Sequence, residues 1–428
     1  MPSVNRVARR AGFLAALGAI PLALAYRFAV VYRVRAGLPR RVVPRLTPAD
    51  RGLPFEDTIV RSSGGDLPAW FIPARGGARG PGIVLVHGWE SNRDRTLPNA
   101  QVLHAAGFHV LTFDVRGHGA NPAEEMPISV GEFRDDATAA LDTLLTRPEV
   151  TRAGFLGHSL GAVGAALAAA AAGDRCDALV VSSAPADPRS LTRQTFRLAN
   201  LWIPEPFATP LAALTSRVYV RPRGHRVRDL SASRAVASYA GPILLVHGVE
   251  DSVVPPSHLG RLELAALAGQ RARVAGGFPA GGPIESLLVA EGHHSWLYEH
   301  EPYRRAVAAF LAGALSRPSA GDRTSEILLV PKEAADRAAA VDARRIPDPD
   351  EAFAAITTAP SRRRRMAELI GAAHPAAVEV PPSPTLPPSP AYGNGATLAP
   401  EAGPPPEPSP PPEAAAAAGP RDAIASPR

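Results

Sequence analysis

Ser159 stands between two glycines, at positions 157 and 161, in the stretch FLGHSLGAVGAALAAAAAG (Phe155–Gly173). Apolar residues typical of a strand precede this serine, and an alanine-rich run typical of a helix follows it. A serine at a sharp strand-to-helix turn has a strained backbone, and small residues two positions to either side relieve the crowding. The pattern predicts either a tight turn filled with small residues or a turn that exposes a nucleophilic hydroxyl, and the motifs that follow favour the second.

A serine hydroxyl needs a general base, and a carboxylate must orient that base. The chain offers Asp251 in HGVEDSVVP, directly after an apolar run. It offers His293 and His294 in VAEGHHSW, after the last apolar run. We therefore expect Asp251 to be the acid and one of the two adjacent histidines to be the base.

Two backbone amides are candidates for an oxyanion hole. The N–H of Leu160 begins the predicted helix and points toward the place where negative charge develops on the substrate. The N–H of Trp89, in VLVHGWESN after the first long apolar run, is the second candidate. A donor of this kind contributes roughly 100-fold to 1000-fold in rate.

Other residues near the predicted strand ends have plainer interpretations. Asp114 is a substitute candidate for the acid, with Glu250 behind it, and Arg116 is expected to brace its loop. Trp89 and Trp296 either line an acyl pocket or simply pack. Because one base suffices, four histidines are expected to pack or to form hydrogen bonds: His87, His118, His158 and His247.

The elements that must position these residues alternate in type along the chain. Two short β-like runs, FEDTIV and LPAWFIP, flank a turn at Gly64–Gly65. Continuous apolar runs then alternate with helical stretches such as 97–106 and VGEFRDDATAALDTLL. Apolar runs without polar alternation suit strands that are covered on both faces. The order predicts an α/β domain with a doubly wound, mostly parallel central sheet flanked by helices.

The alternation lapses over residues 185–240, which we interpret as a small helical lid. Gly269–Pro283 is rich in glycine and alanine and is predicted to be a loop. A last strand (SLLVAEG) and a last helix (EPYRRAVAAFLAGAL) follow, with Pro302 suited to the first turn of that helix. The folded domain is therefore expected to span 53–316.

The N-terminus predicts a membrane-associated segment. A basic tail (1–10) precedes an apolar stretch (11–32), and a basic linker follows (33–52). The apolar stretch is long enough for a transmembrane anchor, although a cleaved signal peptide or an amphipathic helix also fits it. The arginines after it favour a single-pass protein of the cell membrane with a cytoplasmic catalytic domain, and secretion is the alternative.

The C-terminal sequence and the overall composition indicate which partners and cofactors the protein is expected to have. Residues 317–380 are predicted to be weakly structured, and 381–428 to be a disordered Pro/Ala-rich tail that either is solvated or recruits a proline-binding partner. The basic residues are mostly scattered and the net charge is only +6, so nucleic-acid binding is not expected. Cys176 is the single cysteine, and no metal or nucleotide motif is present, so no cofactor is expected.

Taken together, HGW, FDVRGHG, GHSLG, HGVEDSVVP and GHHSW resemble successive landmarks of the α/β-hydrolase superfamily, over about 53–316. The resemblance is greatest to its esterase, dienelactone-hydrolase-like and serine-aminopeptidase-like branches. It implies Ser159 as nucleophile, Asp251 as acid and one of the paired histidines as base. The family's glycine directly before the catalytic histidine favours His293, whereas strand register from Val289 favours His294. We choose His294 and keep His293 as the alternative.

The motifs predict a serine hydrolase that cleaves a carboxylic ester, or a related acyl bond, of a small-molecule substrate through an acyl-serine intermediate. A serine peptidase or an acyltransferase would use the same three residues. A catalytically inactive scaffold tethered to a membrane is the third possibility, and an intact serine, aspartate and histidine set argues against it.

Overall fold

The computed structural model describes residues 2–315, with side chains described from residue 19 onward. The predictions for 317–380 and for the tail 381–428 lie outside the described residues.

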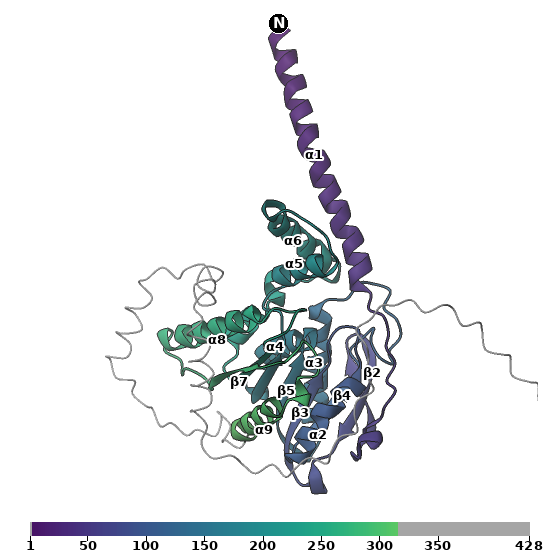
Figure 1. The fold of residues 1–428 in the computed structure, drawn as a ribbon, viewed down its shortest axis with the longest axis vertical. Coiled ribbons are helices and arrows are strands. Elements are labelled where there is room, and N and C mark those ends of the chain that lie inside the picture. Colours follow the sequence, from purple (N-terminus) through teal and green to yellow (C-terminus); the bar gives the residue numbers. More distant parts are fainter. Residues whose placement is uncertain (1, 316–428) are drawn as a thin grey trace, which may run out of the picture. The chain divides into compact units, whose positions relative to one another are not determined.

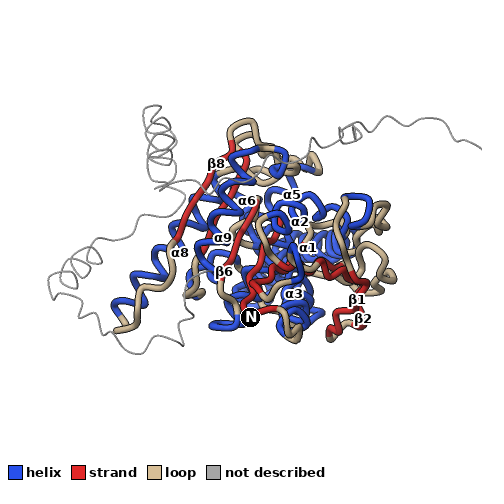
Figure 2. The backbone as a smooth tube through the Cα atoms, turned by 90° about the horizontal axis from the view of Figure 1, so that it is seen from below, coloured by secondary structure: helices blue, strands red, loops and turns tan. Residues whose placement is uncertain are grey.

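The sheet has eight strands in the order β1-β2-β4-β3-β5-β6-β7-β8. The β1–β2 hairpin and the β2–β4 pair are antiparallel, and every other neighbouring pair is parallel. Figure 2 shows the hairpin at the opposite end of the sheet from β8. The strands are β1 (Glu56–Ser62), β2 (Gly65–Ile72), β3 (Gly80–Val86), β4 (His109–Phe113), β5 (Val150–His158), β6 (Ala178–Ser182), β7 (Ile243–Gly248) and β8 (Ile284–Val289). The predicted mostly parallel sheet is confirmed.

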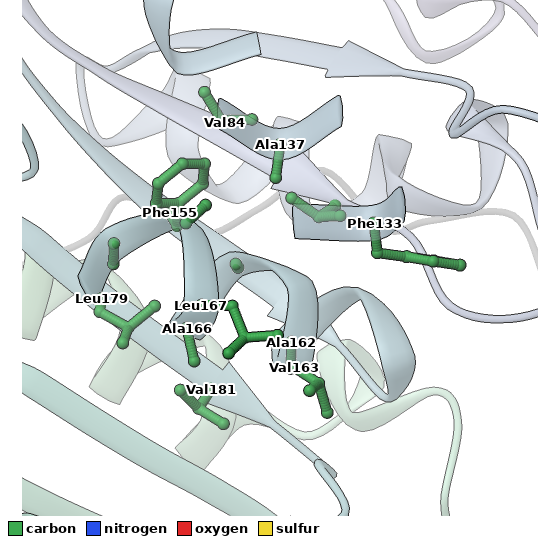
Figure 3. Packing of buried hydrophobic residues seen from close by; sticks show 14 of the residues in the cluster. Val84, Phe133, Ala137, Phe155, Ala162, Val163, Ala166, Leu167, Leu179 and Val181 are labelled. Carbon is green, nitrogen blue, oxygen red and sulfur yellow. The ribbon is translucent and has the colours of Figure 1, made fainter. Parts of the chain in front are cut away.

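Helices cover both faces of this sheet. On one face lie α3 (Val130–Leu145), α4 (Leu160–Ala172), α7 (Ala232–Ser238) and α8 (Ser257–Ala275). On the other lie α2 (Leu97–Ala105) and α9 (Glu301–Leu315). Successive residues of one strand point to opposite faces, so Val84 packs among the first group of helices and Leu85 among the second. Figure 3 shows the first of these cores, where Val84 and Phe155 of the sheet lie near Phe133 and Ala162 of the helices.

The predicted lid segment, 185–240, connects β6 to β7. It contains α5 (Pro188–Leu198), α6 (Glu205–Val220) and α7, and two short 3₁₀ turns join α6 to α7. Asp187 begins α5 as an N-cap, because its side chain accepts hydrogen bonds from the N–H groups of Arg189 and Ser190. The Gln194 amide at the middle of α5 donates to the carbonyl of Ser252 at 3.2 Å, so the segment touches the loop that carries Asp251.

The N-terminal prediction needs correction. The predicted tail (from Pro2), the apolar segment over 11–32 and the first five residues of the predicted linker form one continuous helix, α1 (Pro2–Gly37), and the rest of the linker, 38–52, lies outside it. Among the residues whose side chains are described, no helix is both long and apolar enough to cross a membrane, and residues 11–18 of the predicted segment lie outside this range. The C-terminal part of α1 packs against protein instead: Ala29 is fully buried, and Phe28 lies edge-on to Phe196 of α5.

The predicted loop Gly269–Pro283 is also wrong in its first half. Helix α8 continues through Gly269 and ends at Ala275. A Cβ atom on Gly269 would lie 1.9 Å from the carbonyl oxygen of Ala237, so this glycine allows α8 to approach α7 closely. The glycine is a packing requirement within a helix and does not mark the end of it.

Candidate active site

Ser159 occupies the turn between β5 and α4. Its backbone has φ 53° and ψ −123°, a conformation that non-glycine residues rarely adopt. A Cβ atom on Gly157 would lie 2.5 Å from Ala162 Cα, and one on Gly161 would lie 2.2 Å from the carbonyl oxygen of His87. Both glycines are therefore required where β5, α4 and the end of β3 converge, and the turn presents Ser159 at the carboxyl end of the parallel strands.

His294 and Asp251 complete a hydrogen-bonded chain with this serine. The Ser159 hydroxyl donates to Nε2 of His294 at 3.0 Å. The Nδ1–H of the same ring donates to Oδ2 of Asp251 at 2.8 Å. The loops after β5, β7 and β8 bring these three side chains together, although more than 130 residues of chain separate Ser159 from His294.

The two adjacent histidines have different surroundings. The side chain of His294 is 15% exposed and faces Ser159. The side chain of His293 is 67% exposed, and its Nε2 lies 3.7 Å from Oε2 of Glu250. Only His294 is within hydrogen-bond distance of the serine hydroxyl, which is the geometry that the strand register from Val289 predicts.

The carboxylate of Asp251 is buried and fully engaged. Its Oδ1 accepts hydrogen bonds from the N–H groups of Val253 and Val254, at 3.0 and 2.7 Å. Its Oδ2 accepts from His294 and also from Nε2–H of His247, at 3.1 Å. Burial by itself would raise the pKa of Asp251, but the hydrogen bonds from His247 and His294 outweigh it and hold the pKa below its ordinary value of 3.8. Asp251 is therefore charged at neutral pH and holds His294 in the tautomer that accepts from serine.

The contribution of His247 was not predicted beyond a general hydrogen-bonding role. His247 is the penultimate residue of β7 and is fully buried. Its Nε2–H donates to the Val254 carbonyl at 2.8 Å as well as to Asp251, so the ring ties both ends of the acid loop together. The four-residue spacing from His247 to Asp251 is the only sequence signal for this contact, and outside a helix that spacing does not imply proximity.

The two predicted oxyanion donors flank Ser159. A Cβ atom on Gly88 would lie 3.3 Å from Ser159 Cβ, which shows how closely the loop before Trp89 approaches the serine. Leu160 is the first residue of α4, where N–H groups have no intrahelical acceptor. Within the described residues, neither the Trp89 N–H nor the Leu160 N–H donates to a protein acceptor. Their role as oxyanion donors stays a prediction.

Several histidines surround the site in neutral form. Burial lowers the pKa of His158 to about 3, and the nearby His294 ring, at a centroid distance of 5.1 Å, adds to the effect. Burial also lowers the pKa of His87 to about 4 and that of His118 to about 4. His87 accepts the N–H of Val115 at 3.0 Å and supports the loop below Trp89. All three rings pack against neighbouring rings, and His87 and His118 also form hydrogen bonds, as the sequence indicated.

The substitute acid lies apart from the histidine pair. Asp114 is fully buried and accepts from the N–H and the guanidinium of Arg93, at 2.7 and 2.8 Å. Arg116 forms a buried ion pair with Asp136 of α3, which fastens the loop after β4.

Trp296 is covered by the Arg95 guanidinium, which lies 3.9 Å from the ring centroid, and Trp89 stacks on Phe133. In the described part of the chain, no group of three His, Cys, Asp or Glu residues is arranged to hold a metal ion.

Known proteins resemble this part of the chain. Residues 80–222 match the family described as serine aminopeptidase, S33. The chain is 28% identical over 261 residues to an uncharacterized protein of Mycobacterium tuberculosis, covering 60% of this chain and 82% of that one. It is 27% identical over 247 residues to the alpha/beta hydrolase domain-containing protein WAV2 of Arabidopsis thaliana, covering 57% and 77%. An esterase from Pyrococcus furiosus has a similar fold, with a TM-score of 0.50 and 20% identity over 65% of this chain and 97% of that one.

Proposed function

Because the chain belongs to the α/β-hydrolase superfamily, we propose that it is a serine hydrolase that cleaves a carboxylic ester or a related acyl bond through an acyl-Ser159 intermediate. The single observation that carries the proposal is the chain of two hydrogen bonds from Ser159 through His294 to Asp251. This arrangement supports proton removal from a hydroxyl that is otherwise a poor nucleophile near neutral pH. The strained turn at Ser159 adds support, because such strain is concentrated at functional sites.

The proposed reaction has two halves. In the first, Ser159 Oγ attacks the carbonyl carbon while Nε2 of His294 takes the hydroxyl proton, and the N–H groups of Trp89 and Leu160 stabilise the oxyanion. The tetrahedral species collapses, His294 returns the proton to the departing alcohol, and an acyl-serine ester remains. In the second, a water molecule gives a proton to His294 and its oxygen attacks the acyl carbon. Collapse then releases a carboxylic acid and restores the Ser159 hydroxyl. Throughout, the Asp251 carboxylate stabilises the charged form of His294.

A serine-directed phosphonate probe with a fluorescent reporter tests the reaction class. The wild-type chain should be labelled, and Ser159→Ala should abolish labelling. His294→Ala should reduce the labelling rate by about 1000-fold or more, because the hydroxyl loses its base. His293→Ala is the matched control and should keep wild-type labelling. Persistent labelling of Ser159→Ala, or loss of labelling in His293→Ala alone, would overturn the assignment.

A peptidase is the second candidate, and the match to the serine aminopeptidase family is the observation that favours it. The same three residues can cleave an amide when the leaving amine is protonated by the histidine. A matched pair of substrates with one acyl group, presented as an aryl ester and as an aryl amide, separates the two. We expect turnover of the ester alone, and Ser159-dependent turnover of the amide as well would assign a peptidase instead.

A further inference from the structure

Four large apolar side chains are exposed together where α5 ends and α6 begins. We call Leu198, Leu201, Trp202 and Phe207 the lid rim. Trp202 is 87% exposed and Phe207 is 66% exposed, the highest values among the large apolar side chains of the described residues. Exposed aromatic residues concentrated in ten residues of chain are unusual on a soluble surface and indicate a binding partner.

The segment that bears the lid rim is strongly basic. Residues 188–223 contain six arginines and one acidic residue, Glu205. Glu205 is shared between Arg193 and Arg197, at 2.8 and 3.5 Å. Within the described residues no carboxylate lies within ion-pair distance of the other exposed arginines of α5 and α6, Arg189 and Arg217. Aromatic and aliphatic side chains on a basic helical segment are the composition of protein surfaces that bind anionic membranes.

Helix α1 adds a second apolar surface next to the lid rim. The Tyr219 hydroxyl of α6 donates to the carbonyl of Ala36 at 3.2 Å, and Tyr32 bonds to Thr195 of α5. Figure 1 shows part of α1 beside α6. Phe28 and Tyr32 of α1 pack on Phe196 of α5, which lies two residues before Leu198 of the lid rim. Leu24 and the neighbouring Leu22 are both more than half exposed.

We propose that the lid rim and the adjoining face of α1 bind the surface of a membrane that contains anionic lipids. Tryptophan and phenylalanine prefer the boundary between headgroups and acyl chains, and each nearby arginine contributes about 1 kcal/mol of attraction to anionic lipid. Two further apolar side chains of α1, Ile20 and Tyr26, are also more than half exposed. A second copy of the chain is disfavoured as the occupant, because the arginines of two lid segments would face one another.

This surface also has a link to the site around Ser159. Gln194 of α5 is bonded to the loop that carries Asp251, and Asp187 at the start of α5 pairs with Arg261 of α8. The lid segment therefore stands beside the acid loop while its rim faces outward. Membrane binding itself does not depend on the proposed chemistry, since no rim residue belongs to the serine, histidine and aspartate set.

Vesicle binding by the full chain tests the proposal. Vesicles of phosphatidylcholine and phosphatidylglycerol, with part of the lipid brominated in its acyl chains, should quench tryptophan emission, and Trp202→Phe should remove most of that quenching. The double variant Trp202→Ser/Phe207→Ser should bind about 10-fold to 100-fold more weakly, because two aromatic side chains no longer leave water. Phe278→Ser removes a similarly exposed aromatic at the end of α8 and should bind like wild type. Vesicles of phosphatidylcholine alone should bind more weakly than the anionic ones.

Two outcomes would overturn the proposal. One is wild-type binding by the double variant together with no Trp202 quenching, which would leave the lid rim without a role at the membrane. The other is a dimer in sedimentation without lipid that the double variant abolishes, which would assign the lid rim to a second copy. Ser159→Ala should bind vesicles like wild type, so failure of the proposed chemistry and failure of membrane binding give different results.

Discussion

The strand ends around Ser159 and the lid segment are built in opposite ways. At the strand ends, backbone atoms approach the glycines so closely that a methyl group would not fit. The side chains of Ser159, His294 and Asp251 all have hydrogen-bond partners there. In the lid segment, large apolar side chains are left in solvent and the arginines outnumber the acidic residues. Close packing therefore fixes the positions of the atoms at the strand ends, whereas the lid segment has apolar surface that no other part of the described protein covers.

The difference indicates a division of labour. Chemistry at a hydroxyl needs groups positioned to a fraction of an ångström, which a close-packed sheet edge provides. Binding to a fluid surface needs exposed apolar area and charge, and it tolerates imprecise positioning. Substitutions in the two regions should therefore have separable effects, with large losses of turnover from the strand ends and small ones from the lid.

Gly161→Ala should have the largest effect. The new methyl group would meet the backbone oxygens of His87 and Val86, at 2.2 and 2.4 Å, and neither can move without displacing β3. We expect the free energy of unfolding to fall by about 3 kcal/mol and kcat/KM on a soluble aryl ester to fall by at least about 100-fold. Denaturant titration and steady-state kinetics measure both.

Gly313→Ala is the matched control for that substitution. Gly313 lies inside α9, and an added methyl group would have nothing within 4 Å, so alanine should stabilise the protein by about 0.5–1 kcal/mol and leave turnover unchanged. If Gly161→Ala kept wild-type turnover, close packing at the strand ends would not be what positions Ser159.

His247→Leu should have the next largest effect. The substitution removes a donor from the buried Asp251 carboxylate, whose pKa should rise toward its ordinary value, and it loosens the loop that orients His294. We expect kcat to fall about 10-fold to 100-fold with little change in KM, since His247 acts through Asp251 and does not touch substrate. His247→Gln keeps an N–H donor and should recover part of the loss. A lower affinity for substrate with kcat unchanged would contradict this positioning role.

Acid should destabilise the strand ends through their desolvated histidines. His158 is half-buried, and desolvation by the surrounding protein gives it a folded-state pKa of about 3, against 6.5 for an ordinary histidine. Its contribution to stability is therefore complete above about pH 6.5 and is lost as the pH falls toward 3, because the unfolded chain takes up a proton that the folded chain does not. The free energy of unfolding should fall by about 1.4 kcal/mol per pH unit for each such histidine.

Denaturant titrations between about pH 7 and pH 5 measure this slope. His158→Gln should reduce the slope by the contribution of one histidine, whereas His293→Gln, at an exposed side chain, should leave the slope unchanged. A slope that is equal in all three proteins would mean that His158 is accessible to protons in the folded state.

Much of the sheet and of the candidate site was predictable, because the signals are local. Continuous apolar runs identified the parallel strands, and the run EPYRRAVAAFLAGAL, with Pro302 in the first turn, placed the last helix at Glu301–Leu315, as observed. The capping pair Ser129 and Glu132 fixes the start of α3. Loops after parallel strands meet at one edge of a sheet, so the order of motifs brought Ser159, Asp251 and the two adjacent histidines together, and the strand register from Val289 favoured His294 over His293.

The features that were missed depend on tertiary contacts. Gly269 suggested a loop because it is a helix breaker, yet its contact with Ala237 and the surrounding good helix formers keep it within α8. The sequence of α1 is apolar on average, and this average did not reveal that one face of the helix, with Phe28, Ala29 and Tyr32, packs on the lid segment. A local pattern reports how apolar a stretch is and cannot specify which partner buries it.

The smallest effect on turnover should come from the lid rim itself. Trp202→Ser/Phe207→Ser changes two side chains that contact none of the three proposed catalytic residues, so kcat/KM on a soluble aryl ester without lipid should change by less than about twofold. The fold should be equally unaffected, because neither side chain is buried. Steady-state kinetics and denaturant titration of the double variant beside Phe278→Ser measure this. A loss of more than about 10-fold would mean that the rim closes over the substrate, and the division between a catalytic edge and a binding lid would then fail.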